Sequence, residues 1–240
     1  MIEKVKRFGA WRWAPLCVGI IMAVFAMLLG LFFDCAEVDT MTRYAPMAEF
    51  FAEGNWQEVF HPRFPLLFQT LAGVLVWATG MPGYIACFLL STCFWGLAIP
   101  LLFLVMERIF DRQTAWLTVV LYIICPMLLT YSLFGLRESL RTLGTLLVVY
   151  AIFLRIEKPC GTLLPLFVGM LILCTVRSDT LLLAIILWAV YAWFDRAGWR
   201  SWSTVAWCAL CVQPMCWVTY RWLGVWLPSS QWVSMWNRLF

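Results

Sequence analysis

The sequence predicts an all-α polytopic membrane protein, and two observations lead to that fold class. Apolar residues make up 64% of the 240 residues and charged residues only 12%, whereas a soluble domain is about half apolar and about a quarter charged. Unbroken apolar stretches, such as residues 16–33 and 143–154, do not alternate as the strands of a membrane barrel would. Because a backbone in lipid must satisfy its own hydrogen bonds, these stretches predict helices.

Seven stretches are candidates for transmembrane helices, each expected to need about 20 mostly apolar residues. We expect one membrane domain over residues 1–240, with the first span at 13–33, an outer loop at 34–82, six further spans within 84–221 and a tail at 222–240. The six later spans are placed at 84–106, 114–131, 140–154, 162–176, 180–194 and 201–220. The basic N-terminus followed by a long apolar run predicts an uncleaved first span.

The large first outer loop is predicted to carry surface helices. Residues 42–53 place Tyr44, Met47, Ala48 and Phe51 on one face at helical spacing, and Gly54 is a stop signal. Residues 64–79 are apolar but number only about 16, which is short for a span. We expect this stretch to lie in the outer surface or dip into it.

Lys and Arg placement predicts that the N-terminus is inside, because cytoplasmic loops are enriched in these residues. With 64–79 not crossing, the inside holds ten cations: Lys4, Lys6, Arg7, Arg12, Arg108, Arg112, Arg155, Lys158, Arg196 and Arg200. The outer loops hold Arg43, Arg63, Arg137, Arg177 and Arg221, with Arg141 just within a span. This topology predicts a multi-pass protein of the cytoplasmic (inner) membrane. Polar residues at 34–39, 137–138 and 177–179 then share the outer face.

Several other site classes are disfavoured by the pattern. The Lys and Arg residues are scattered at helix ends and form no stripe, so nucleic acid is not an expected partner. Most of the ten cysteines lie in apolar runs and the chain has a single histidine, so no zinc or haem motif is present. The sixteen tryptophans are typical of interfacial belts and lipid-facing surfaces.

An ordered set of short motifs runs along the chain. Asp39 precedes Arg43-Tyr44-Ala45, and the loop continues as Gly54-Asn55-Trp56 and His61-Pro62-Arg63-Phe64-Pro65-Leu66-Leu67. Later come Arg108 to Arg112 with Ala115, then 126–140 leading to Glu138, then Thr175-Val176-Arg177. In this order the chain resembles GT-C-type membrane glycosyltransferases, in the group related to protein O-mannosyltransferases and the lipid A aminoarabinose transferase. The resemblance extends over their N-terminal module.

The resemblance implies transfer of a sugar from a polyprenyl-phosphate donor, within membrane lipid, to a glycan, lipid or protein acceptor. It implies Asp39 as the catalytic base, with Asp34 or Glu37 as alternatives, and Glu138 as a residue that orients the acceptor or shares a divalent metal with Asp39. Arg177 would bind the donor phosphate, with Arg137 or Arg43 as alternates. Tyr44 and His61 complete the implied substrate-binding set, although His61 could instead anchor the proline-rich turn.

Two other function classes stay open at this point. A transporter or flippase of a lipid-linked substrate would place ionisable groups at mid-membrane and often show inverted repeats, and neither is seen in the sequence. A truncated, non-catalytic member of the same group would bind lipid or a partner protein. The sugar, the acceptor, metal dependence and oligomeric state are not specified by the sequence.

Overall fold

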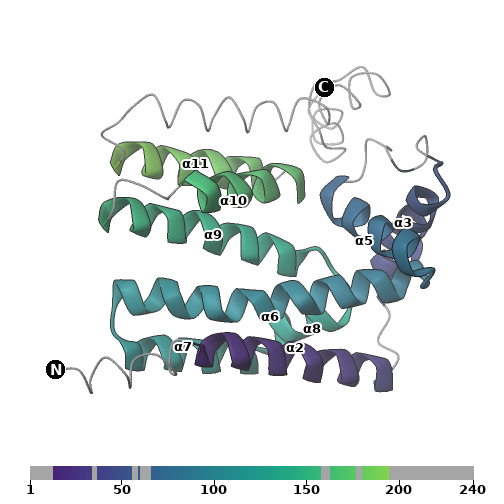
Figure 1. Cartoon of the computed structure of the whole chain (residues 1–240), viewed down its shortest axis with the longest axis horizontal. Coiled ribbons are helices and arrows are strands. Elements are labelled where there is room, and N and C mark those ends of the chain that lie inside the picture. The colour runs from purple at the N-terminus through teal and green to yellow at the C-terminus, as the bar shows by residue number, and fades with distance from the viewer. Residues whose placement is uncertain are drawn as a thin grey trace, which may run out of the picture.

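The computed structural model describes residues 13–33, 37–55, 59, 66–157, 163–176 and 180–194. Every regular element in these ranges is a helix, which confirms the all-α prediction for this part of the chain. Figure 1 shows a stack of helices lying roughly side by side, with two short helices, α3 and α5, at one end. The stack contains α2 (Ala14–Phe33), α6 (Gly83–Ile109), α7 (Arg112–Ile124), α8 (Pro126–Leu133), α9 (Glu138–Glu157), α10 (Leu163–Val176) and α11 (Thr180–Phe194).

Three of these helices, α2, α6 and α9, are long and apolar enough to cross a membrane. Helices α7 and α8 pass the same test only when they are taken together as one bent span. Helices α10 and α11 have 14 and 15 residues, fewer than the roughly 20 that span a hydrocarbon core. The described helices therefore account for three or four of the seven predicted spans, and the span predicted at 201–220 lies outside the described residues.

The span predicted at 114–131 is not one straight helix. It is bent by 56° between α7 and α8, at Cys125, whose ψ of 110° is extended. Pro126 causes the break, because a proline disfavours the helical conformation of the preceding residue. It also has no N–H for the carbonyl group of Tyr122, four residues earlier. A hydropathy profile misses this break because the residues on both sides of it are apolar.

The amphipathic helix of the outer loop is present but begins earlier than predicted. A π-helical turn, η1 (Thr40–Tyr44), runs directly into α3 (Ala45–Ala52). Tyr44 and Ala48 are buried, as the helical spacing predicts, and Gly54 ends the segment with a φ of +77°. Helix α5 (Leu66–Thr79) has 14 residues and lies beside α3 at the end of the stack (Figure 1). Its position in the outer surface stays a prediction.

Small residues allow helices α2 and α6 to pack with their backbones in contact. Gly19, Ala23 and Gly30 lie along the buried face of α2. A Cβ atom added at Gly19 would lie 2.5 Å from the carbonyl oxygen of Gly96 in α6. Helices α9 and α10 meet in the same way, since a Cβ added at Gly144 would lie 2.5 Å from Cγ2 of Ile172. Close packing of small residues is a main source of helix association in lipid, where helices gain no hydrophobic energy from each other.

We expect Gly19→Leu to lower the thermal stability of the protein in lipid nanodiscs, by about 1–3 kcal/mol, because overpacking forces the α2 and α6 backbones apart. Cys17→Leu is the matched control, since Cys17 is exposed on the same helix and should tolerate the larger side chain. A thermal-unfolding midpoint that falls equally in both variants would contradict this account of the interface.

Asp111 begins helix α7 as its N-cap. Its backbone is extended, and its Oδ1 atom accepts a hydrogen bond of 2.8 Å from the Thr114 N–H group. Hydrogen bonds from the side chain and backbone of Thr114 hold the pKa of the Asp111 carboxyl below its usual value. Such a cap satisfies one of the N–H groups that the first turn of a helix leaves without a partner.

The Asp111 cap predicts a pH-dependent contribution to stability. Because the folded-state pKa is lowered, the contribution is complete above the unfolded-state pKa of about 3.9 and is lost as the pH falls through the folded-state value. Asp111→Ala should therefore lower the unfolding midpoint at pH 7, and the difference from wild type should shrink below about pH 4. Glu107→Ala, at an exposed site near the end of α6, should show no such pH-dependent loss.

Candidate functional site

Five of the seven residues implied as site residues lie in the part of the chain that the structure describes. Asp39, Arg43 and Tyr44 lie in or next to η1, and Arg137 and Glu138 lie at the start of α9. His61 and Arg177 are outside the described residues, as is the alternative base Asp34. Of the three polar clusters predicted for the outer face, the structure describes residues 37–39 of the first and residues 137–138 of the second. The third, at residues 177–179, lies outside the described residues.

Asp39 and Arg43 form an ion pair along one turn of the helical segment. The Arg43 guanidinium lies 2.9 Å from Oδ1 of Asp39, and the two side chains are 52% and 42% exposed, respectively. The Asp39 N–H group donates a 2.8 Å hydrogen bond to the carboxylate of Glu37. An exposed pair at this spacing contributes only about 0.3–0.5 kcal/mol to stability. The pair places the Asp39 carboxylate beside the Arg43 guanidinium.

Thr40 connects η1 to the turn between α8 and α9. Its hydroxyl donates a 2.6 Å hydrogen bond to the carbonyl oxygen of Phe134, 94 residues away in sequence. The adjacent Gly135 has a φ of +68°, and a Cβ there would lie 3.0 Å from the backbone nitrogen of Phe88. Glycine suits this position because it adopts positive φ freely and leaves room for the neighbouring backbone.

The turn that carries Arg137 and Glu138 is also held from α6. The buried hydroxyl of Ser91 lies 2.7 Å from the carbonyl oxygen of Leu136 and 3.1 Å from the hydroxyl of Ser139. Buried hydrogen bonds of this kind restrict the positions that the turn can adopt. The backbone on both sides of Arg137 and Glu138 is therefore anchored.

Arg137 is a mostly buried cation placed over the Tyr44 ring. Its guanidinium carbon lies 5.6 Å from the centre of that ring, a distance at which a cation is attracted to an aromatic face. Its side chain is 16% exposed and that of Glu138 is 21% exposed, with Nε and Oε1 4.0 Å apart. This distance is too long for a hydrogen bond, and the buried Nε group has no hydrogen-bond partner.

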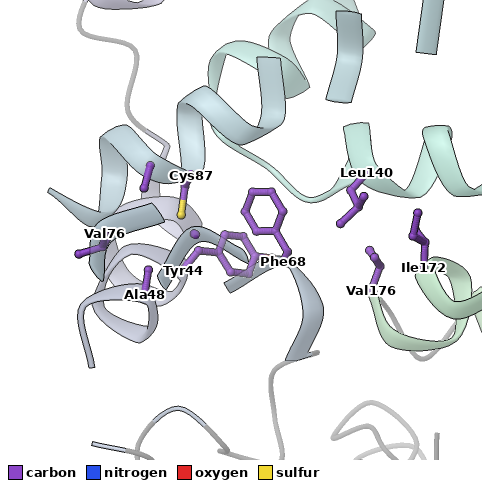
Figure 2. Packing of buried hydrophobic residues seen from close by; sticks show 10 residues of the cluster. Tyr44, Ala48, Phe68, Val76, Cys87, Leu140, Ile172 and Val176 are labelled. Atoms are coloured by element: carbon purple, nitrogen blue, oxygen red, sulfur yellow. The ribbon is translucent and has the colours of Figure 1, made fainter. Parts of the chain in front are cut away.

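The Tyr44 ring is fixed by an apolar cluster that several helices share. Its edge packs against Phe68 of α5, with ring centres 5.7 Å apart and planes at 78°. Figure 2 shows the buried side chains around this ring pair. The cluster contains Tyr44, Ala48, Phe68, Ala72, Val76, Ala86, Cys87, Leu140, Ile172 and Val176. The position of the Arg137 guanidinium thus depends on packing between η1, α3 and α5 and the ends of α6, α9 and α10.

Glu49, an acidic residue of α3, has a structural role. Oε1 of Glu49 accepts a 2.9 Å hydrogen bond from the N–H group of Gly83, at the start of α6. A carboxylate at this position satisfies an N–H group of the first turn and interacts favourably with the helix dipole. Glu49 thereby fastens α3 to the end of the long helix α6.

Gln69 was not among the residues implied by the sequence. It is 0% exposed within α5, and neither atom of its side-chain amide has a hydrogen-bond partner. Buried amides without partners are rare, because each costs its full desolvation free energy. In the sequence, Gln69 is marked only as the single amide within the mainly apolar residues 66–79.

The described residues form no cluster of metal-binding side chains. Within these ranges, no three side chains of His, Cys, Asp or Glu lie close enough to hold a metal ion. Cys17, Cys87 and Cys93 are free thiols within helices, consistent with the apolar role that the sequence predicts for them. A divalent metal shared by Asp39 and Glu138 stays a hypothesis.

Thr40→Val should destabilise the protein by about 1–3 kcal/mol, because it leaves the Phe134 carbonyl group without its hydrogen-bond donor in a partly buried site. Thr42→Val is the matched control, since the Thr42 hydroxyl bonds to Val38 within its own exposed turn, where water can replace it. Thermal unfolding in nanodiscs, with limited proteolysis of the outer loop, measures both variants. Equal stability of the two variants would show that Thr40 does not anchor the loop.

Comparison with known proteins identifies no family for this chain. No family model matches it, and neither a curated protein nor a solved structure does so. The resemblance to GT-C-type glycosyltransferases therefore rests on the ordered sequence motifs, and the activity that it implies is a proposal.

Proposed function

We propose that this protein transfers a sugar from a polyprenyl-phosphate donor to an acceptor at the outer face of the cytoplasmic membrane. The observation that carries the proposal is the docking of the Asp39–Arg43 segment onto the Arg137–Glu138 turn, through Thr40 and Tyr44. Two acidic and two basic side chains from distant parts of the chain are thereby gathered at one end of the helix stack.

The proposed topology has seven spans with the N-terminus inside. In Figure 1, α2 ends, α6 begins and α9 begins at the end of the stack where α3 and α5 lie. The turn between α6 and α7, with Arg108 and Arg112, is at the other end. The proposed orientation, with Asp39 and Arg137 at the outer face, rests on the Lys and Arg count along the whole sequence and the positive-inside rule.

Asp39 is the proposed general base. An acceptor hydroxyl would attack the anomeric carbon with inversion, while the bond from that carbon to the phosphate oxygen breaks and polyprenyl phosphate leaves. Asp39 would take the hydroxyl proton, a contribution of about 10²–10⁴-fold to the rate. The ion pair with Arg43 would keep the carboxylate oriented toward the acceptor.

Arg137 is the proposed group for the departing phosphate. Its guanidinium is mostly buried, is held over Tyr44 and retains an Nε donor without a hydrogen-bond partner. A planar guanidinium can give a phosphate two parallel hydrogen bonds, which a lysine cannot. Arg177, the first choice from the sequence, lies outside the described residues, so the contacts favour Arg137 among the described candidates. Glu138 would orient the acceptor beside it.

The test is release of polyprenyl phosphate from a mixed pool of polyprenyl-phosphate sugars, followed by mass spectrometry with purified protein in native-like lipid. Wild type should consume at least one donor, and Asp39→Asn should lower release by about 10²–10⁴-fold. Arg137→Lys should lower it by at least about tenfold, because the charge is kept and the planar fork is lost. Glu53→Gln, at an exposed acidic site in the same loop, should match wild type.

Each alternative outcome has a distinct meaning for the proposal. Equal release by wild type and Asp39→Asn would retain the enzyme and move the base to Asp34, Glu37 or Glu138. No release by well-folded wild type with lipid, glycan and protein acceptors supplied would contradict the proposed activity. It would favour a non-catalytic protein that binds lipid or a partner.

A further inference from the structure

Ser91 of α6 has a buried hydroxyl that contacts three groups around the turn between α8 and α9. Its Oγ atom lies 2.7 Å from the carbonyl oxygen of Leu136, 3.2 Å from that of Tyr131 and 3.1 Å from the hydroxyl of Ser139. Ser91 is completely buried and Ser139 nearly so. A single side chain of the long helix α6 therefore contacts the end of α8, the turn itself and the start of α9.

The contacts of Ser91 need a group that both donates and accepts hydrogen bonds. A hydroxyl has one hydrogen and two lone pairs, so Ser91 can donate to the Leu136 carbonyl group while its oxygen accepts from the Ser139 hydroxyl. This chain of two hydrogen bonds joins α6 to both sides of the turn, and the low local dielectric of a buried site strengthens it. Ser91→Ala would remove both bonds and leave a residue that favours the helix.

The two hydrogen bonds of Ser91 lie on either side of Arg137. Leu136 precedes this residue and Ser139 follows it by two positions, so the backbone on both sides is tied to α6. At the far end of the side chain, the guanidinium lies over the Tyr44 ring, and its Nε group has no hydrogen-bond partner among the described residues. The direction of this Nε group is therefore set by the backbone at one end and by an aromatic ring at the other.

We propose that Ser91 is a positioning residue: through the start of α9, it holds the Arg137 guanidinium where it binds the phosphate of the lipid donor. This inference rests on the proposed function, in which Arg137 binds that phosphate. A guanidinium gives a phosphate two parallel hydrogen bonds only when its plane is correctly oriented, and a misplacement of about 1 Å can cost about 10²-fold in rate. Ser91 acts through Arg137, since its own hydroxyl is buried within the helix stack.

The first test measures the affinity of the full chain in nanodiscs for undecaprenyl phosphate, which carries the phosphate without a sugar. Ser91→Ala should bind it about tenfold more weakly than wild type, the effect of losing about one hydrogen bond to the phosphate. Ser91→Cys, which keeps a weak donor and acceptor, should recover part of this loss. Ser132→Ala should bind as wild type does; it is the matched control, because Ser132 is also completely buried but its hydroxyl bonds to Leu129 within its own helix.

The second test separates positioning from a general loss of stability. In the Arg137→Gln background, Ser91→Ala should change the affinity by less than about twofold, because the group that Ser91 positions is gone. A serine that only stabilised the fold would lower the affinity by the same factor in both backgrounds. Amide hydrogen exchange of residues 134–139, measured on the same samples with the unfolding midpoints, should be faster in Ser91→Ala and unchanged in Ser132→Ala.

Three results would overturn the inference: wild-type affinity of Ser91→Ala, an equal loss of affinity in the Arg137→Gln background, or unchanged exchange of the turn in Ser91→Ala. The outcomes also separate it from the proposed activity. If Asp39→Asn abolishes transfer while Ser91→Ala binds as wild type does, the enzyme stands and the role of Ser91 falls. If Ser91→Ala weakens binding only when Arg137 is present, but well-folded wild type transfers no sugar, the positioning stands and the activity falls. If wild type does not bind undecaprenyl phosphate, the role of Arg137 and that of Ser91 fall together.

Discussion

The packing of Tyr44 is the interaction on which the candidate site depends. One face of its ring lies under the Arg137 guanidinium, and its edge packs against Phe68. The ring therefore joins an apolar cluster, built from η1, α3, α5 and the ends of α6, α9 and α10, to the polar groups above it. The Thr40 hydroxyl, one turn earlier, adds a hydrogen bond to the α8–α9 turn. These two contacts join the Asp39–Arg43 segment directly to the turn that carries Arg137.

The lipid environment sets the second constraint, which is that helices must associate without a hydrophobic driving force between them. Glycines allow close helix packing at two interfaces. Gly19 and Gly96 lie at the α2–α6 interface, and Gly144 and Gly169 lie at the α9–α10 interface. At these positions the helix backbones approach so closely that a methyl group would not fit, which increases dispersion contacts along the interface. The stack that results is the support to which α3 is attached through the hydrogen bond between Glu49 and Gly83.

The candidate site contains two charged pairs that differ in how far their side chains are exposed to solvent. Asp39 and Arg43 are about half exposed, so their ion pair orients the side chains more than it stabilises the fold. Arg137 and Glu138 are mostly buried, and the 4.0 Å between Nε and Oε1 leaves the donor capacity of Arg137 incompletely used. Desolvated charge of this kind is costly unless it is compensated. An anionic ligand would supply that compensation.

The sequence by itself determined the helical class, the positions of α2, α6 and α9, and the end of α3 at the glycine turn. These features depend on local properties: the length of an apolar run, the spacing of its apolar residues, and the positive φ that Gly54 accepts. It also predicted that the polar segments near Asp39 and Glu138 lie at the same end of the molecule. The break at Cys125 was missed because hydropathy does not register the N–H group that Pro126 lacks.

Only the tertiary structure decided which polar groups meet. The contact of Thr40 with Phe134 and that of Tyr44 with Arg137 join segments more than 90 residues apart. No local periodicity specifies such pairs, because they depend on how α5, α6 and α9 pack around one aromatic ring. The same holds for Gln69: the sequence shows an amide in an apolar helix, but whether it is exposed, hydrogen-bonded or buried without a partner is set by the surrounding helices. Burial and hydrogen bonding are properties of the packed structure, so they could be assigned only once the helices were in place.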